Sequence, residues 1–170
     1  MEIAVSAGAD AVGFIVGTTH KSEDSISTSE AREMIRSLPP FVSGVVVTHL
    51  TDADDLVRLV EETGCSILQI QDMVSVAKEF EPFADAILLD SRTADRLGGT
   101  GITHDWSISA KVVEGVSKPV ILAGGLKPEN LFEAMSVVKP YAVDVHSGVK
   151  RDGVRDLERT REFVQIAHGF

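Results

Sequence analysis

Short apolar runs alternate along the chain with segments whose apolar residues repeat at helical spacing. Six of the runs are apolar at almost every position, which indicates strands that are buried on both faces. We expect these strands at residues 11–16, 42–47, 66–71, 86–90, 119–123 and 141–145. Helices are expected at residues 2–8, 27–38, 52–64, 73–83, 107–116, 129–138 and from about 156 to the end. This alternation, at roughly 25-residue spacing, predicts an α/β fold in which helices cover a parallel sheet.

Several of the predicted helices carry start and stop signals. Ser27 and Glu30 have the spacing of a capping box, and Asp52 is a candidate N-cap. Gly8 and Gly64 are suited to end helices in a left-handed conformation. The apolar faces predicted for two of the helices consist of Ala31, Met34, Ile35 and Leu38, and of Leu131, Ala134, Met135 and Val138.

The stretch 119–130 combines a buried strand, two glycines and a helix start. Gly124-Gly125 follows the strand, and Pro128 suits the first turn of the next helix. A similar turn, Ser147-Gly148, follows the next strand. Glycines leave backbone N–H groups accessible, and the helix dipole favours negative charge at a helix start. We therefore expect both turns to bind an anion, with ordinary turn chemistry as the alternative.

Length and charge limit the partners. The 170 residues can form one full core, so residues 1–170 are predicted to be a single domain. The net charge of -10 and the pI of about 4.9 disfavour nucleic acid and anionic membranes as partners. Because the overall field repels an anionic ligand, such a ligand would need a local site.

The cysteine and histidine positions limit which disulfides and metal sites the chain can form. The single cysteine, Cys65, excludes an internal disulfide and suits a reducing cytoplasm, where we expect the protein to work. No apolar run approaches the ~20 residues of a membrane helix, and no secretory pattern is present. The histidines have no metal-binding spacing, so no metal is expected. They lie at positions 20, 49, 104, 146 and 168.

Four motifs in the second half of the chain occur in a characteristic order. They are Leu89-Asp-Ser91, Gly98-Gly-Thr-Gly-Ile-Thr-His-Asp-Trp106, Leu122-Ala-Gly-Gly-Leu-Lys-Pro-Glu-Asn-Leu131 and Val143-Asp-Val-His-Ser-Gly-Val149. Together they resemble the phosphoribosylanthranilate isomerase family, and Gly13-Phe14 resembles its second strand. The resemblance implies a TIM-barrel-like (β/α) parallel barrel, here reduced to about six strands where such barrels have eight.

The resemblance also implies an activity. The family belongs to tryptophan biosynthesis and catalyses an Amadori rearrangement of an N-linked ribose phosphate. A general acid protonates the ribose ring oxygen and the ring opens to a Schiff base. A general base then removes the C2′ proton, which gives an enol and finally a ketone. No metal or organic cofactor is implied, and the expected partner is a phosphorylated ribose-containing small molecule.

Site residues follow from the same resemblance. Asp90 would be the general acid, a role that needs a carboxyl kept protonated near neutral pH by partial burial. The remaining expected residues would contact the substrate or bind its phosphate through N–H groups and one hydroxyl. They are Gln69, Gly99, Gly101, Gly124, Gly125, Ser147 and Gly148.

The sequence also departs from the family pattern. The family begins with a strand ending Lys-Ile-Cys-Gly, whose cysteine is the general base, and we expect that strand and one further βα unit to be missing here. Cys65 opens its own strand and should face the opposite edge. Gln71 stands where the family has a histidine, and Asp24 where it has an arginine. A missing strand exposes neighbouring edges, which predicts a tighter barrel, an edge covered by residues 1–8, or a homodimer.

His146 replaces the first serine of the family's Ser-Ser-Gly motif. Its pKa lies near neutrality in ordinary surroundings, so it is a candidate for the missing base. The alternatives for His146 are a solvated loop residue and a phosphate contact. At the level of the whole chain, the alternatives are a non-catalytic phosphosugar-binding or regulatory protein and another sugar-phosphate isomerase or aldolase-like enzyme.

Overall fold

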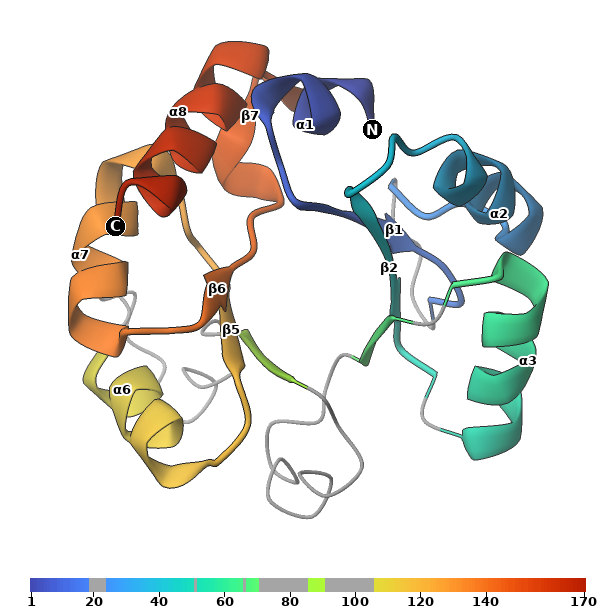
Figure 1. Ribbon diagram of the computed structural model, residues 1–170, viewed down its shortest axis with the longest axis horizontal. Helices are drawn as coiled ribbons and strands as arrows, with labels where there is room; N and C mark the ends of the chain where they lie inside the picture. The colour runs from blue at the N-terminus through green and yellow to red at the C-terminus, as the bar shows by residue number, and fades with distance from the viewer. Residues whose placement is uncertain (19–23, 51, 66, 71–85, 91–105) are drawn as a thin grey trace. The chain divides into compact units, whose positions relative to one another are not determined.

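The computed structural model describes residues 1–18, 24–50, 52–65, 67–70, 86–90 and 106–170 (Figure 1). The chain forms two compact units, Met1–Asp72 and Met73–Phe170. The predicted helix at residues 73–83 and the glycine-rich loop with Gly99 and Gly101 lie outside the described residues.

The first unit is a three-stranded parallel sheet with helices. In chain order its elements are α1 (Glu2–Ala7), β1 (Ala11–Ile15), α2 (Thr28–Arg36), β2 (Ser43–Thr48), α3 (Ala53–Thr63) and β3 (Leu68–Ile70). The strands lie in the order β1-β2-β3, with Phe14 beside Val46 and Val47 beside Gln69. Helices α2 and α3 lie side by side on one side of this sheet (Figure 1). All three predicted strands of this half are therefore confirmed, and residues 66 and 71, the ends predicted for the third strand, lie outside the described residues.

Helix caps in the first unit agree with the sequence. Ser27 Oγ accepts a hydrogen bond from the Glu30 amide at 3.2 Å, and the Ser27 amide donates to Glu30 Oε2 at 2.8 Å. Asp52 caps α3 by accepting from the amides of the following turn. Gly8 and Gly64 end α1 and α3 with φ of 89° and 70°. These are left-handed values, which glycine adopts without steric cost.

The predicted apolar face of α2 is partly wrong. Ala31 is fully buried, but Met34 is 38% exposed. Gly44 on β2 leaves room for Ile35, whose Cγ1 lies 3.0 Å from where a Cβ would stand on that glycine. Because α2 approaches the sheet through Ala31 and Ile35, Met34 is rotated toward solvent.

The second unit contains a parallel sheet followed by a small hairpin. Its elements are β4 (Ile87–Asp90), α6 (Trp106–Gly115), β5 (Val120–Ala123), α7 (Pro128–Val138), β6 (Ala142–Val143), the 3-10 turn η4 (Ser147–Val149), β7 (Lys150–Arg151), β8 (Val154–Arg155) and α8 (Leu157–His168). Strands β4, β5 and β6 are parallel and in that order, whereas β7 and β8 are antiparallel. The described residues thus contain six parallel strands, the number predicted.

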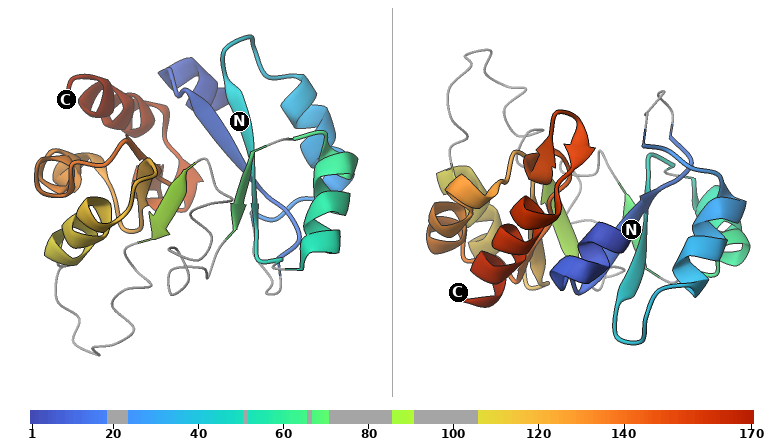
Figure 2. Two further views of the ribbon diagram at one scale, coloured as in Figure 1. Left: turned by 60° about the horizontal axis from the view of Figure 1, so that its bottom comes forward. Right: turned by 90° about the horizontal axis from the view of Figure 1, so that it is seen from above.

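Helix α7 packs its apolar face into the core of this unit. Its predicted apolar face is confirmed, since Leu131, Ala134, Met135 and Val138 are all buried. They pack with Leu122 of β5 and Phe163 of α8. Helix α7 lies between α6 and α8 along the outside of the sheet (Figure 2). Among the described helices, none is long and apolar enough to cross a membrane.

The segment 146–153 differs from the expected simple loop. It contains η4 and the turn of the β7–β8 hairpin, with Asp152 and Gly153 at positive φ. The two-residue strands of this hairpin are too short to give an alternating pattern, which explains why the sequence did not reveal them.

Candidate functional site

The carboxyl edge of the sheet β4–β5–β6 brings several predicted site residues together. Asp90 is the last residue of β4 and lies in register with Ala123, directly before Gly124. On the other side of β5, the Asp144 amide donates to the Leu122 carbonyl at 2.8 Å. Asp144 is followed by Val145 and His146. The general-acid candidate, the double glycine and the His146 turn therefore leave the sheet at the same edge.

The turn after β5 has a backbone that glycine favours. Gly124 and Gly125 have φ of 89° and 66°. Gly125 is exposed, and a Cβ at this position would meet no atom within 4 Å. In the part of the chain that the structure describes, no group accepts a hydrogen bond from the Gly125 amide. This N–H group is accessible to a ligand.

Asn130 holds this turn in place from the first turn of α7. Its Oδ1 accepts from the Lys127 amide at 2.9 Å, and its Nδ2 donates to the Gly125 carbonyl at 3.1 Å. Pro128 occupies the first position of the helix, as predicted. The Asn130 side chain thus links the glycine turn to the first turn of α7.

The two predicted anion-binding turns are in direct backbone contact. A Cβ placed on Gly148 would lie 1.8 Å from the carbonyl oxygen of Leu126 and 3.0 Å from the Cα of Lys127. No real Cβ can approach an oxygen so closely, so only glycine permits this packing. The structure therefore brings Ser147-Gly148 against the segment that follows Gly124-Gly125.

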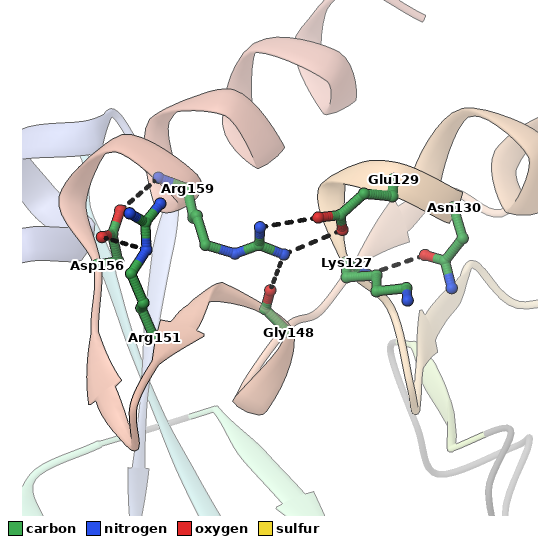
Figure 3. A network of polar contacts seen from close by, with 7 residues as sticks. All are labelled: Lys127, Glu129, Asn130, Gly148, Arg151, Asp156 and Arg159. Atoms are coloured by element: carbon green, nitrogen blue, oxygen red, sulfur yellow. Dashed lines mark hydrogen bonds and ion pairs between the residues drawn. The ribbon is translucent and has the colours of Figure 1, made fainter.

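Arg159 connects three elements around this contact (Figure 3). Its Nη1 and Nη2 donate to the two carboxylate oxygens of Glu129 at 2.8 Å and 3.0 Å, and Nη2 also donates to the Gly148 carbonyl at 3.1 Å. Glu129 belongs to the first turn of α7. The Arg159 hydrogen bonds lower the pKa of Glu129 to about 2, because they favour the ionised carboxylate. The same partner raises the pKa of Arg159.

The position of Arg159 depends in turn on the start of α8. Asp156 Oδ1 accepts from the Arg159 amide at 2.8 Å and caps the helix, while its Oδ2 lies 3.3 Å from Arg151 Nε. The hydrogen bond from the Arg159 amide, and then the Arg151 cation, lower the pKa of Asp156. A charged cap therefore fixes the first turn of the helix that carries Arg159.

The other candidate residues lie in different places. His146 is half-buried and immediately precedes Ser147. Gln69 belongs to β3 of the first unit, opposite Val47. Cys65 is buried ahead of β3, and its Sγ lies 3.1 Å from the Gly44 carbonyl at the start of β2. Cys65 therefore occupies the amino edge of its sheet, as predicted.

Sequence reasoning missed Arg159, Glu129 and Asn130 as parts of this site. Asn130 carried a signal, because it stands at the third helical position, where a side chain can reach back to the N-cap amide. Arg159 and Glu129 carried none, since each is a charged residue on a helix and they are 30 positions apart in the chain.

Two kinds of ligand, a metal ion and an anion, come into question for this edge of the sheet. Within the described residues no group of three or more histidine, cysteine, aspartate or glutamate side chains could hold a metal ion. The exposed Gly125 lies just before the start of α7, where backbone N–H groups and the helix dipole can interact favourably with an anion. The backbones of Asp90 and His146 leave the sheet at the same edge, and both residues remain predictions for the site.

The family profile and the relatives with similar sequences name the same family. Residues 69–166 match the profile of N-(5'-phosphoribosyl)anthranilate (PRA) isomerase. The chain is 39% identical to N-(5'-phosphoribosyl)anthranilate isomerase 2 of Methanosarcina mazei, in an alignment covering 97% of this chain and 87% of that protein. The alignment spans 197 positions, more than the 170 residues of this chain, so the relative has internal residues without a counterpart here.

Solved structures of the same family share the fold. Phosphoribosyl anthranilate isomerase from Thermotoga maritima superimposes with a TM-score of 0.75 at 29% identity, covering 99% of this chain and 93% of that one. A family structure in complex with reduced 1-(o-carboxyphenylamino)-1-deoxyribulose 5-phosphate gives a TM-score of 0.74 at 30% identity, with 99% and 92% covered. The fold is TIM-barrel-like, as predicted. The chain belongs to the phosphoribosylanthranilate isomerase family and is an enzyme of the intramolecular oxidoreductase class.

Proposed function

We propose that this protein isomerises N-(5'-phosphoribosyl)anthranilate in tryptophan biosynthesis and holds the 5'-phosphate between the turns after β5 and β6. The observation that carries this proposal is the backbone contact between Gly148 and Leu126, which places two glycine turns side by side in a member of this family. The ligand of the related complex is itself a sugar 5-phosphate, so the chemistry of the group to be bound agrees.

The phosphate is bound chiefly by backbone amides. Gly125, Ser147 and Gly148 donate N–H groups, the Ser147 hydroxyl adds one more donor, and Gly124 gives the turn its left-handed backbone. Such donors need no net positive charge, which suits a chain of net charge -10. Gln69, Gly99 and Gly101 remain predicted contacts to the rest of the substrate.

Asp90 is the general acid in this proposal. Its carboxyl proton passes to the ribose ring oxygen, the C1′–O bond breaks, and the anilino nitrogen lone pair forms the Schiff base. A base then takes the C2′ proton, and the C2′–H electrons form the enol C1′–C2′ double bond, which neutralises the iminium nitrogen. Proton transfer from the C2′ hydroxyl to C1′ completes the ketone.

His146 is the proposed base. It follows β6 at the same sheet edge as Asp90, and an imidazole accepts protons near neutral pH. Cys65 is not a candidate in the family's cysteine role, because it is buried at the amino edge of its sheet. No metal or organic cofactor takes part in these steps.

The test uses the complete chain with N-(5'-phosphoribosyl)anthranilate and follows the conversion of substrate by chromatography. We expect turnover in the wild type, a fall of at least about 10²-fold in kcat for Asp90→Asn, and a comparable fall for His146→Ala. Full activity of Asp90→Asn would refute the acid assignment, and unchanged turnover of His146→Ala would remove the base assignment. Growth of a tryptophan auxotroph that expresses this chain tests whether the activity serves tryptophan biosynthesis.

A second function is favoured by the burial of the chain's single cysteine. Because Cys65 is buried at the amino edge of its sheet, it does not supply a base, and the alternative is a protein that binds ribose phosphates without converting them. Binding of ribose 5-phosphate together with no turnover of N-(5'-phosphoribosyl)anthranilate would establish this regulatory or ligand-binding alternative. The cytoplasmic location, the single domain and the homodimer remain predictions.

A further inference from the structure

Arg159 makes contacts that an ordinary surface ion pair does not make. One guanidinium group reaches Glu129 on α7 through two nitrogens and the Gly148 carbonyl through one of them (Figure 3). Its side chain is only 23% exposed, whereas that of Glu129 is 54% exposed. The guanidinium therefore lies on the inner side of the pair, against the backbone of the Ser147–Val149 turn.

The Gly148 carbonyl controls the orientation of its peptide group. Peptide units are planar, so the hydrogen bond from Arg159 to the Gly148 carbonyl fixes the plane of the peptide that joins Gly148 to Val149. Glycine has no side chain to limit rotation of the flanking peptides. On one face Gly148 is held by the close contact with Leu126, and on the carbonyl side it is held by Arg159.

We infer that Arg159 is a positioning residue for phosphate binding, which fixes the peptide between Gly148 and Val149 and, through Glu129, holds the Ser147–Gly148 turn against the start of α7. This inference rests on the proposed function, because it concerns the same phosphate site. Arg159 itself does not touch the ligand. Glu129 is its anchor, since a bidentate carboxylate holds the planar guanidinium in one orientation.

The geometry of the guanidinium distinguishes this role from a charge effect. An arginine fork can donate to both Glu129 oxygens and to Gly148 at once, whereas a lysine ammonium is a point charge without a fixed fork. A lysine at position 159 would keep the ion pair with Glu129 and lose the bond to Gly148. If only the charge mattered, lysine would restore function.

The experiment measures binding of inorganic phosphate by calorimetry and steady-state kinetics with N-(5'-phosphoribosyl)anthranilate. For Arg159→Met and Arg159→Lys we expect the Kd of inorganic phosphate and the KM of the substrate to rise roughly tenfold, with kcat changed less than about twofold. Arg161→Met is the matched control, because Arg161 lies on the same helix and its ion pair is with Glu158. It should leave both constants within about twofold.

The outcomes separate the inference from the proposed function. A wild-type chain that neither binds inorganic phosphate nor converts substrate would overturn the proposed function and the inference together. Wild-type binding that Arg159→Lys retains in full would overturn the inference alone. If a thermal melt shows that Arg159→Met does not fold, phosphate binding by Arg159→Lys and Glu129→Gln decides whether the inference holds. Glu129→Gln should weaken phosphate binding less than Arg159→Lys, and the reverse order would show that the ion pair matters rather than the Gly148 bond.

Discussion

Gly148 is the residue at which the proposed site tolerates least change. Its flexibility matters less than its lack of a side chain, since a Cβ would lie 1.8 Å from the Leu126 carbonyl oxygen. The conflict is with backbone atoms of another turn, which cannot rotate away as a side chain could. Any substitution must therefore separate the two turns.

We predict that Gly148→Ala lowers the free energy of unfolding by about 1–3 kcal/mol, the usual cost of overpacking, and weakens phosphate binding. Chemical denaturation and phosphate calorimetry measure the two effects. Gly115→Ala is the control, because a Cβ at the end of α6 would meet no atom within 4 Å. Gly115→Ala should be neutral or slightly stabilising. Equal stability of Gly148→Ala and wild type would show that the turns do not pack as described.

The ionisation of Glu129 makes the stability of the folded protein depend on pH in the acid range. Its pKa is lowered from 4.5 to about 2 by Arg159, so its carboxylate stabilises the folded state above pH 4.5 and loses that contribution as the pH falls toward 2. We predict that Glu129→Gln melts at a lower temperature than wild type at pH 7 and that the difference shrinks between about pH 4.5 and 2. The effect should be modest because Glu129 is half exposed.

Thermal melts across this pH range, at low and high salt, measure the difference. Glu133→Gln removes a carboxylate from the same helix, and no ion pair joins Glu133 to another described residue. A difference that grows on acidification would contradict the assignment of the lowered pKa to the Arg159 pair.

At the scale of elements, local signals in the sequence were sufficient for the helix caps and for the buried face of α7, but not for the whole face of α2. The buried face of α7 and the capping box of Ser27 both depend on spacings of three or four residues, so they could be read directly. Met34 was misplaced because the packing of α2 depends on Gly44, in a different element. The role of Arg159 was missed for the same reason, since its partners are distant along the chain.

The α7 face leads to a prediction about stability. Leu131 is fully buried beside Leu122 and Phe163, so Leu131→Ala should lower the free energy of unfolding by about 2–5 kcal/mol through lost burial and a new cavity. Val137 on the same helix is 45% exposed, and Val137→Ala should change stability by less than about 0.5 kcal/mol. Denaturant titration of both variants measures the contrast. Similar losses for the two would show that α7 is not packed through the Leu131 face.

At the scale of the whole molecule, net charge and ligand charge have the same sign. The chain carries -10 and the proposed substrate is anionic, so the overall field slows their encounter even though the site's amides attract phosphate. Salt shortens the range of this repulsion, from about 30 Å at 0.01 M to about 10 Å at 0.1 M.

We therefore predict that kcat/KM rises by roughly two- to tenfold when sodium chloride is raised from about 0.01 M to 0.1 M. Steady-state kinetics across this range is the measurement. The value of kcat serves as an internal control, since it reports the complex already formed and should stay constant. A steady fall of kcat/KM over the same range would mean that local cations, rather than neutral amides, dominate the attraction.

Each of the two compact units has an apolar core of its own, one built around Val46 and Phe14 and the other around Leu122 and Leu131. During translation, residues 1–72 leave the ribosome before residues 73–170. The sheet β1–β2–β3 can thus bury its apolar residues before the turns proposed to bind phosphate have been synthesised. A phosphate ligand that binds at residues 124–125 and 147–148 would therefore act only after the first unit has been synthesised.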